Sequence, residues 1–364
     1  MIYLDYQATT PLAPEARSAM LPYLDEKFGN PHSPHRLGRE AAAAVDVARE
    51  QVASLLPSGG RLAFTSGATE SLNWAIKGSH GPIVTSATEH AAVLDSVRAA
   101  GQAERAVTIL TVGADGLIDL DAARVAIAPG TGLVAIMLVN NEIGVIQPVE
   151  QLAELAHAAG ALFLCDAVQG YGRVAIPANC DLVAISAHKV HGPKGIGALW
   201  VRDGVTLDPL LHGGGQEAPG RSGTLAPMLC AGFGAAATLM ASRADVDAAH
   251  VARLWLLATR HLGPEWRING SAEHRYRGNL NVRRDGIDSA RLISGLRGLA
   301  FSAGSACASG SGRPSHVLKA LGLTDRQARS SIRLGFGRYT SESDIGAAMT
   351  MILDAAARQA MWAA

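Results

Sequence analysis

The fold is decided by the stretch Asp181-Leu182-Val183-Ala184-Ile185-Ser186-Ala187-His188-Lys189-Val190-His191-Gly192-Pro193-Lys194-Gly195. It begins as a short apolar run, which is typical of a strand, and ends in a polar turn with two histidines and two lysines. A strand that ends in such a turn presents side chains at the carboxyl edge of a sheet, where ligands bind in α/β proteins. Lys189 is therefore the first candidate for a centre of chemistry.

Apolar segments and helix-like segments alternate around this stretch. Strands are expected at residues 61–64, 82–85, 106–110, 132–139, 161–165, 181–186 and 197–201. Helices, recognised by apolar spacing, are expected at 37–56, 69–77, 91–100, 120–127 and 149–159. The strands are apolar on both faces, which predicts an α/β fold with a mostly parallel sheet covered by helices on both sides.

A different pattern begins after Asp245. Helices are expected at 250–261 and 288–296, and strands at 266–269 and 277–282, which together indicate a smaller α+β lobe. A chain of 364 residues is long for one domain, so two lobes are the natural expectation. Residues 301–314 are mostly Ser, Gly and Ala, a composition that predicts a mobile loop in the second lobe.

Composition argues against several classes of function. The formal net charge is zero, which gives no reason to expect nucleic acid or an anionic membrane as a partner. There is no signal peptide and no apolar run of about 18 residues, so we expect a cytoplasmic protein. The four cysteines form no C-x-x-C pair, and neither an H-E-x-x-H motif nor a Cys/His cluster occurs. We therefore expect no disulfide framework and no metal site.

Lys189 has two interpretations. Most lysines are solvated at the surface, and Lys189 could be one of them. A lysine at a strand end, between His188 and His191, is however poorly placed for solvation, and nearby positive or desolvating groups would lower its pKa. A lowered pKa suits Schiff-base chemistry, and the chain has only five lysines that could supply it. Position alone leaves the two interpretations evenly balanced.

Asp166 and His90 also stand where strands end. Asp166 follows the apolar run 161–165, where a carboxylate is costly to bury without a partner. It could cap the next turn, or it could pair with the ring nitrogen of a pyridine-type cofactor. His90 could cap the following helix, or it could stack on a flat ligand and transfer protons. Both pairs of alternatives stay open.

An anion site and a carboxylate site are further candidates. Residues 66–70 follow a strand and open a helix, so their backbone N–H groups favour an anion such as phosphate. The segment is neither a Walker loop nor G-x-G-x-x-G, so nucleotide binding is not supported. Arg333 alternates with apolar neighbours as in a strand. Its guanidinium could pair with a carboxylate of the fold or with that of a substrate.

Cys307 differs from the other cysteines. Cys165, Cys180 and Cys230 adjoin apolar sequence, and we interpret them as small buried side chains. Cys307 lies in Ser302-Ala303-Gly304-Ser305-Ala306-Cys307-Ala308-Ser309-Gly310, where a thiol is not expected to pack as core. An exposed thiol is a hazard unless it is used, so Cys307 is a candidate functional residue.

Nine motifs occur together in an order that is characteristic of one enzyme family. They are Leu4-Asp5-Tyr6-Gln7-Ala8-Thr9-Thr10, Phe28-Gly29-Asn30-Pro31-His32-Ser33, Ser66-Gly67-Ala68-Thr69-Glu70-Ser71, Asn140-Asn141-Glu142-Ile143-Gly144, Asp166-Ala167-Val168-Gln169, Ser186-Ala187-His188-Lys189, Arg221-Ser222-Gly223-Thr224, Gly304-Ser305-Ala306-Cys307 and Ile332-Arg333-Leu334. With them the chain resembles the pyridoxal-phosphate-dependent cysteine desulfurases of the NifS/IscS type, within the class V aminotransferase group. The resemblance covers nearly the whole chain.

The resemblance implies fold type I of the pyridoxal-phosphate-dependent transferases. A mostly parallel seven-stranded sheet is expected in a large cofactor-binding domain at residues 15–245. Residues 1–14 and 246–364 are expected to form a smaller α+β domain that carries the Cys307 loop. The resemblance also implies a homodimer.

The resemblance further implies a role for each candidate residue. Lys189 would form the Schiff base with pyridoxal 5'-phosphate and move the Cα proton, while Cys307 would attack the substrate sulfur. The cofactor ring would be contacted by His90, Asp166, Gln169 and Asn141. The phosphate would be bound by Ala68, Thr69, Ser186, His188 and, from a second subunit, Thr224. The substrate carboxylate would be bound by Asn141 and Arg333.

The implied reaction converts L-cysteine to L-alanine and leaves a persulfide on Cys307. An acceptor or iron–sulfur scaffold protein would then take the sulfur for iron–sulfur cluster or other sulfur-cofactor biosynthesis. The alternatives are a selenocysteine lyase, which has a better leaving group and less need of Cys307, and a class V aminotransferase, which needs no loop thiol. A fold-mate that acts only as a scaffold would have lost the lysine, the aspartate or the phosphate residues, and all are present.

Overall fold

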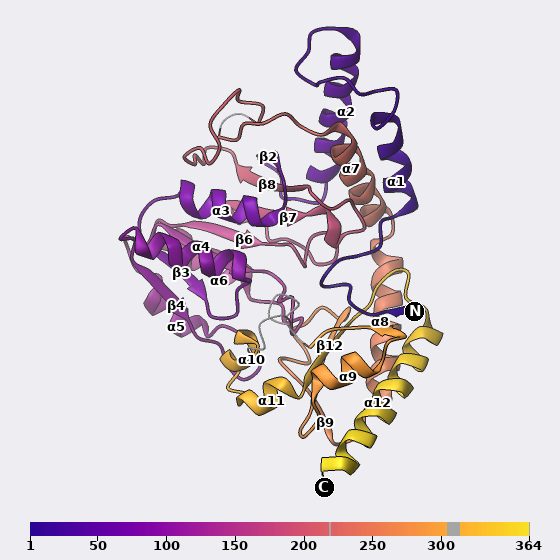
Figure 1. Ribbon diagram of the computed structural model, residues 1–364. Helices are drawn as coiled ribbons and strands as arrows, with labels where there is room; N and C mark the ends of the chain where they lie inside the picture. Colours follow the sequence, from indigo (N-terminus) through magenta and orange to yellow (C-terminus); the bar gives the residue numbers. More distant parts are fainter. Residues whose placement is uncertain (218–219, 304–313, 364) are drawn as a thin grey trace.

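The computed structural model describes residues 1–217, 220–303 and 314–363, arranged as two lobes (Figure 1). The first lobe contains, in chain order, α1 (Pro14–Met20), η1 (Leu21–Tyr23), α2 (Arg36–Ala53), β2 (Gly60–Thr65), α3 (Ala68–Gly78), β3 (Ile83–Ser86), α4 (Ala91–Gln102), β4 (Val107–Leu110), α5 (Leu120–Ala126), β5 (Leu133–Met137), α6 (Val149–Ala158), β6 (Leu162–Asp166), β7 (Leu182–Ser186), η2 (Ala187–Lys189), β8 (Gly197–Arg202) and α7 (Pro227–Ser242). The second contains β1 (Ile2–Tyr3), α8 (Ala244–Arg260), β9 (Trp266–Ile268), β10 (Asn279–Arg284), α9 (Ser289–Gly295), β11 (Leu299–Ala300), α10 (His316–Ala320), α11 (Asp325–Arg329), β12 (Ser331–Gly335) and α12 (Glu342–Ala363).

A seven-stranded sheet forms the centre of the first lobe, as predicted. Its strand order is β2-β8-β7-β6-β5-β3-β4. Strand β8 is antiparallel to β2 and β7, and the other neighbouring pairs are parallel. The carboxyl ends of β3, β5, β6 and β7 therefore meet at one edge of the sheet, which is where ligands bind in this architecture.

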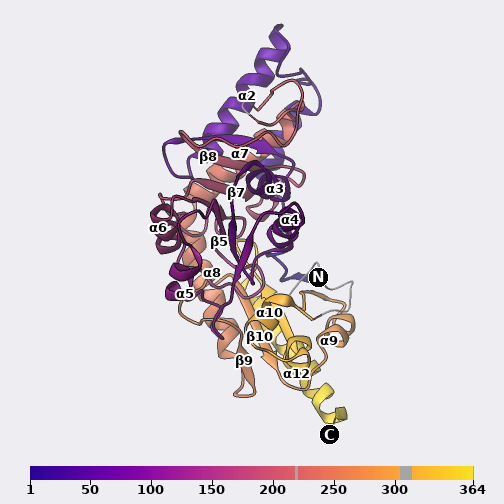
Figure 2. The ribbon, with the colours of Figure 1, turned by 90° about the vertical axis from the view of Figure 1, so that its left-hand side faces the viewer.

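Helices cover both faces of this sheet (Figure 2). On one face, apolar side chains of α3 and α4, among them Leu72 and Val97, pack with Leu164 of β6. On the other face, α2, α5, α6 and α7 contribute side chains such as Phe233, which pack with Phe163. Because both faces of the sheet are buried, the sequences of its strands are continuous apolar runs without alternating polar residues.

The second lobe has a hydrophobic core of its own. Its three-stranded antiparallel sheet has the order β12-β10-β9, and β1 pairs in parallel with β11. Leu4, from the N-terminus of the chain, packs in this core with Trp266 and Ile352. We propose that the two cores belong to two domains, with residues 1–14 and 246–364 in the smaller one.

Five described α-helices, α1, α7, α10, α11 and α12, were not expected from the periodicity of the sequence. Helix α7 buries mostly small residues against α1 and α2, so it shows no one-sided apolar stripe. Helix α8 begins at Ala244, earlier than expected, with Asp245 and Asp247 in its first turn. Acidic residues there complement the helix dipole, a signal that apolar spacing does not contain. Within the described ranges, no helix is both long and apolar enough to span a membrane.

Candidate active site

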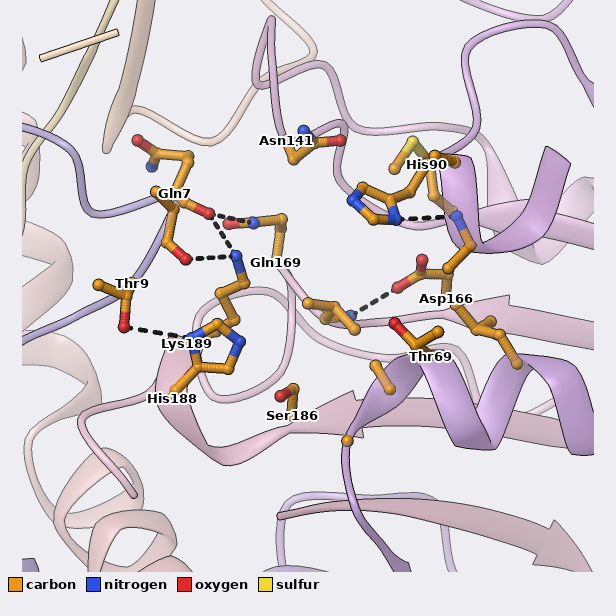
Figure 3. A pocket seen from close by; sticks show the side chains of 18 of the residues that line it. Gln7, Thr9, Thr69, His90, Asn141, Asp166, Gln169, Ser186, His188 and Lys189 are labelled. Carbon is orange, nitrogen blue, oxygen red and sulfur yellow. Dashed lines mark hydrogen bonds between the residues drawn. The ribbon is translucent and has the colours of Figure 1, made fainter. Parts of the chain in front are cut away.

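A cavity of about 930 Å³ lies at the carboxyl edge of the large sheet (Figure 3). The candidate residues that line it are Ala68, Thr69, His90, Asn141, Asp166, Gln169, Ser186, His188, Lys189 and Arg333. Thr224 is exposed and does not line the cavity of its own chain. Cys307 lies outside the described residues. The structure therefore brings together candidates from both lobes that are far apart in sequence.

Lys189 ends the short turn η2 that follows β7. Its Nζ donates hydrogen bonds to the carbonyl oxygens of Gln7, at 2.5 Å, and Ala8, at 2.9 Å (Figure 3). Burial, followed by the positive charges of Arg333 and Arg173, lowers the pKa of Lys189 to about 8. A lowered pKa is the expectation for a lysine at a strand end between two histidines. The alternative interpretation, a solvated surface lysine, is wrong.

The two histidines beside Lys189 are neutral at neutral pH. Burial is the main reason why the pKa of His188 and that of His191 are both lowered to about 4. The Nδ1 atom of His188 lies 3.1 Å from the hydroxyl oxygen of Thr9, which orients the ring (Figure 3). His188 therefore presents a hydrogen-bonding ring to the cavity without adding a positive charge.

Asp166 is buried at the end of β6. Its Oδ1 accepts a hydrogen bond from the backbone N–H of Val168 at 3.0 Å, so the turn-capping interpretation is confirmed. Burial raises the pKa of Asp166 to about 6, although Lys189 opposes this shift. Among the described residues no basic side chain forms an ion pair with Asp166. A buried carboxyl group with spare acceptor capacity favours a cationic ligand.

His90 caps helix α4. Its Nδ1 accepts a hydrogen bond from the backbone N–H of Ala92 at 3.1 Å, which confirms the capping interpretation (Figure 3). Burial, followed by Lys189 and His316, lowers the pKa of His90. Because Nδ1 is an acceptor, the proton of the neutral ring is on Nε2. Capping does not exclude the second interpretation, since the same ring also lines the cavity.

The N-terminus of α3 forms one wall of the cavity. The helix begins at Ala68 after Gly67, and no side chain caps it. The first-turn residues Ala68 and Thr69 line the cavity together with Ser186 and His188. Unpaired N–H groups and the helix dipole favour an anion at such a position.

Arg333, Asn141 and Gln169 line the cavity from three different segments. The guanidinium of Arg333 donates from Nη1 to the carbonyl oxygen of Asn141 at 3.0 Å, and its side chain is only 1% exposed. Gln169 donates from Nε2 to the carbonyl oxygen of Gln7 at 3.0 Å. Its Oε1 is buried and has no partner among the described residues. The wall therefore combines a fixed cation with a free buried acceptor.

Several residues at the site have no role that the sequence predicted. Asp5, Gln7 and Ala8 belong to a motif of the family resemblance, which was the only signal for them. Glu89 is fully buried next to His90, and its Oε1 accepts from the backbone N–H of Met137 at 2.9 Å. Burial, with a smaller contribution from the charge of Asp166, raises the pKa of Glu89 well above its usual value, although the hydrogen bond from Met137 opposes this shift.

Comparisons with known proteins agree with this geometry. Residues 2–347 match the family model described as aminotransferase class-V. The chain is 45% identical, over 368 aligned positions, to the cysteine desulfurase IscS of Rickettsia bellii (strain OSU 85-389), covering 96% of this chain and 90% of the relative. A NifS-like protein from Rickettsia africae ESF-5 has a TM-score of 0.90 at 29% identity, covering 98% of this chain and 99% of that one. SspA in complex with cysteine has a TM-score of 0.84 at 35% identity, covering 94% and 100%.

The matches extend over both lobes, so they include every segment that lines the cavity. They also agree with the family resemblance of the sequence motifs. The chain belongs to the class-V aminotransferase family and, within it, to the cysteine desulfurases of the IscS and NifS type.

Proposed function

We propose that this chain converts L-cysteine to L-alanine and retains the sulfur as a persulfide on Cys307. The observation that carries the proposal is the half-buried amine of Lys189, with a pKa of about 8, in one cavity with Asp166 and Arg333. Removal of the Cα proton of an amino acid needs a base, a stabilised electron sink and a receptor for the carboxylate. These three side chains are suited to those three tasks.

The cavity residues fit pyridoxal 5'-phosphate, which the family implies. A cationic ring nitrogen would supply the partner that buried Asp166 lacks among the described side chains. A ring hydroxyl would donate to the free Oε1 of Gln169, and the ring would stack on His90. The first turn of α3, with Ser186 and His188, would hold the phosphate. When bound, the cofactor withdraws electrons from the substrate Cα and makes its proton removable.

Lys189 is the base of the proposed reaction and the residue that would bind the cofactor aldehyde. As an ammonium group it has two carbonyl acceptors, from Gln7 and Ala8. Its lowered pKa means that a substantial fraction is neutral amine at slightly alkaline pH. The neutral amine would accept the Cα proton. His90, with its proton on Nε2, would supply a proton to the product.

Arg333 and Asn141 would bind the substrate carboxylate. The guanidinium of Arg333 is fixed by the carbonyl oxygen of Asn141 and by Asp5. A fixed guanidinium recognises a carboxylate through directed, charge-assisted hydrogen bonds. This binding orients the substrate and reduces the entropy that the reaction must overcome.

Cys307 would take the sulfur. Its thiolate would form a bond to the substrate sulfur while the carbon–sulfur bond breaks, and the electron pair of that bond would stay with the substrate carbon. Protonation of this carbon gives alanine, and Cys307 keeps the persulfide. The transfer needs no external oxidant or reductant. We further propose that an acceptor or iron–sulfur scaffold protein receives the sulfur in the cytoplasm, where thiols stay reduced.

We also propose that the chain works as a homodimer. Thr224 is exposed and lies outside the cavity of its own chain, although the family resemblance assigns it to the phosphate. Both facts are explained if Thr224 reaches the cavity of a partner subunit.

The test is to supply the purified holoenzyme with sulfur-labelled cysteine and to analyse both products. We expect alanine in solution and labelled persulfide on Cys307. Cys307→Ala should abolish both, and Lys189→Ala should abolish alanine release. Cys230→Ala, which changes a fully buried cysteine, is the matched control and should retain both. Alanine release that continues in Cys307→Ala would overturn the proposal and favour a lyase.

A further inference from the structure

Asp5 forms an ion pair with Arg333. The Oδ1 atom of Asp5 lies 2.6 Å from Nη2 of Arg333. The side chain of Arg333 lines the cavity and is 1% exposed, whereas that of Asp5 is 20% exposed and does not line it. Asp5 therefore contacts the guanidinium from outside the cavity and leaves the cavity itself open to a ligand.

The backbone holds Asp5 beside the strand that carries Arg333. The N–H of Gly335 in β12 donates to the carbonyl oxygen of Leu4 at 2.8 Å, and the N–H of Tyr6 donates to that of Gly335 at 3.3 Å. These two bonds fix the residues on either side of Asp5. The ion pair is therefore built into the fold, unlike a pair between two freely rotating side chains.

Charge is the reason why this pair matters for binding. A guanidinium that already contacts one carboxylate attracts a second one less strongly, because the two carboxylates repel each other in a poorly solvated site. Building on the proposed function, we propose that Asp5 is a positioning residue that sets the affinity of Arg333 for the substrate carboxylate. Asp5 orients the guanidinium, and its negative charge weakens carboxylate binding, which favours release of the product.

The same charge acts on Lys189. Burial, Arg333 and Arg173 lower the pKa of Lys189 to about 8, and Asp5 is the first of the groups that oppose them. The titratable and charged groups around Lys189 are Asp5, His90, Asp166, Arg173, His188 and Arg333. Removing the charge of Asp5 should therefore lower the pKa of Lys189 below about 8.

Asp5→Asn tests the proposal because it keeps the volume and an acceptor for Arg333 but removes the charge. The probe is 3-mercaptopropionate, which has the thiol and carboxylate of cysteine without its amino group; its methyl ester lacks the charge. In calorimetric titrations of the holoenzyme, Asp5→Asn should bind the acid roughly tenfold more tightly than the wild type does. The variant and the wild type should bind the ester with equal affinity. The control is Asp285→Asn, which removes an exposed carboxylate that lies 3.0 Å from Arg283. It should change neither the affinity for the acid nor the affinity for the ester.

A second measurement is the pH profile of alanine release. Its midpoint should move to lower pH in Asp5→Asn, but stay in place in Asp285→Asn and in Asp5→Glu, which keeps the charge. Unchanged or weaker binding of the acid, an equal gain for the ester, or an unmoved midpoint would overturn the proposal. If Asp5→Asn does not fold, Asp5→Ser removes the same charge and the same outcomes apply.

These experiments separate the inference from the proposed function. If the wild type releases no alanine from cysteine, the proposed function fails. The comparison of acid and ester does not depend on turnover, so it still decides whether Asp5 weakens carboxylate binding at Arg333.

Discussion

The Nζ atom of Lys189 lies 2.9 Å from the carbonyl oxygen of Ala8, a residue 181 positions earlier in the chain. The neighbouring Gln7 carbonyl accepts from Lys189 and from Gln169. Two residues further back, Asp5 pairs with Arg333. One N-terminal segment thus contacts the proposed base and the proposed carboxylate receptor, so the two lobes meet around it.

We expect the rate of alanine release to rise with pH through about 8. Only the neutral form of Lys189 accepts a proton, and its pKa is about 8 because burial disfavours the charged form. Initial rates measured at saturating cysteine across the neutral and alkaline range would give the midpoint. Lys189→Arg, which stays charged, should lose activity by about 10³-fold or more. A flat profile in the wild type would contradict the assignment of Lys189 as the base.

Cofactor binding should weaken as the pH falls below about 6. The pKa of Asp166 is raised to about 6 by burial, and the protonated carboxyl group no longer pairs with a cationic ring. The affinity should fall by about tenfold per pH unit once Asp166 is protonated. The absorbance of bound cofactor, measured after equilibration at each pH, tests this. Asp166→Asn should bind weakly at every pH; if it keeps the same pH dependence, another group is responsible.

Two substitutions at His90 should separate its capping role from proton transfer. Asparagine is a good helix N-cap, so His90→Asn should keep stability near that of the wild type but lower alanine release by about 10²–10⁴-fold. His90→Ala should show the same loss of activity and, in addition, lose about 1 kcal/mol of unfolding free energy. Urea denaturation and turnover assays measure the two effects. Full activity in His90→Asn would leave His90 as a capping residue alone.

Glu89 should make the protein less stable as the pH rises. Burial is the main cause that raises the pKa of Glu89 well above 4.5 in the folded chain. The folded chain therefore keeps a proton that the unfolded chain has lost. Stability therefore falls with pH from about 4.5 up to the folded pKa. Glu89→Gln removes the carboxyl group and with it this pH dependence. The variant should therefore gain more unfolding free energy over the wild type at alkaline pH than at acidic pH.

Denaturation of both proteins at two pH values tests this prediction. Glu89→Ala is the contrasting variant, because it leaves the N–H of Met137 without an acceptor and should cost about 2–4 kcal/mol. A difference between Glu89→Gln and the wild type that does not change with pH would show that Glu89 is not protonated in the folded chain.

Much of the large lobe could be predicted from local sequence. The expected strand 181–186 corresponds to β7, and the expected helix 91–100 to α4, because buried strands and amphipathic helices leave distinct patterns of apolar residues. Helix α7 could not be found in this way, since its small residues pack against neighbours on several sides. The candidate site residues at strand ends could be predicted as well, because the apolar runs that identify the strands also show where each strand ends.

The contacts of Asp5, Gln7 and Ala8 could not be predicted in this way. Two of these residues act through backbone carbonyl oxygens, which every residue has, so no side-chain pattern reports them. Asp5 acts through an ion pair with a residue 328 positions away. Only the pairing of β1 with β11, and of the following segment with β12, brings these groups to the cavity.

The sequence by itself determined the alternation of strands and helices, the family, and the chemical types of the side chains at the carboxyl edge. Apolar periodicity and short motifs carry that information, because both are local. The tertiary structure showed that Asp166 caps a turn and His90 a helix, and that both line one cavity with Lys189. Burial and the charges of Arg333, Arg173 and Asp5 determine the pKa of Lys189. A pKa depends on solvent exclusion and on distances between charges, and both arise only when remote segments pack together.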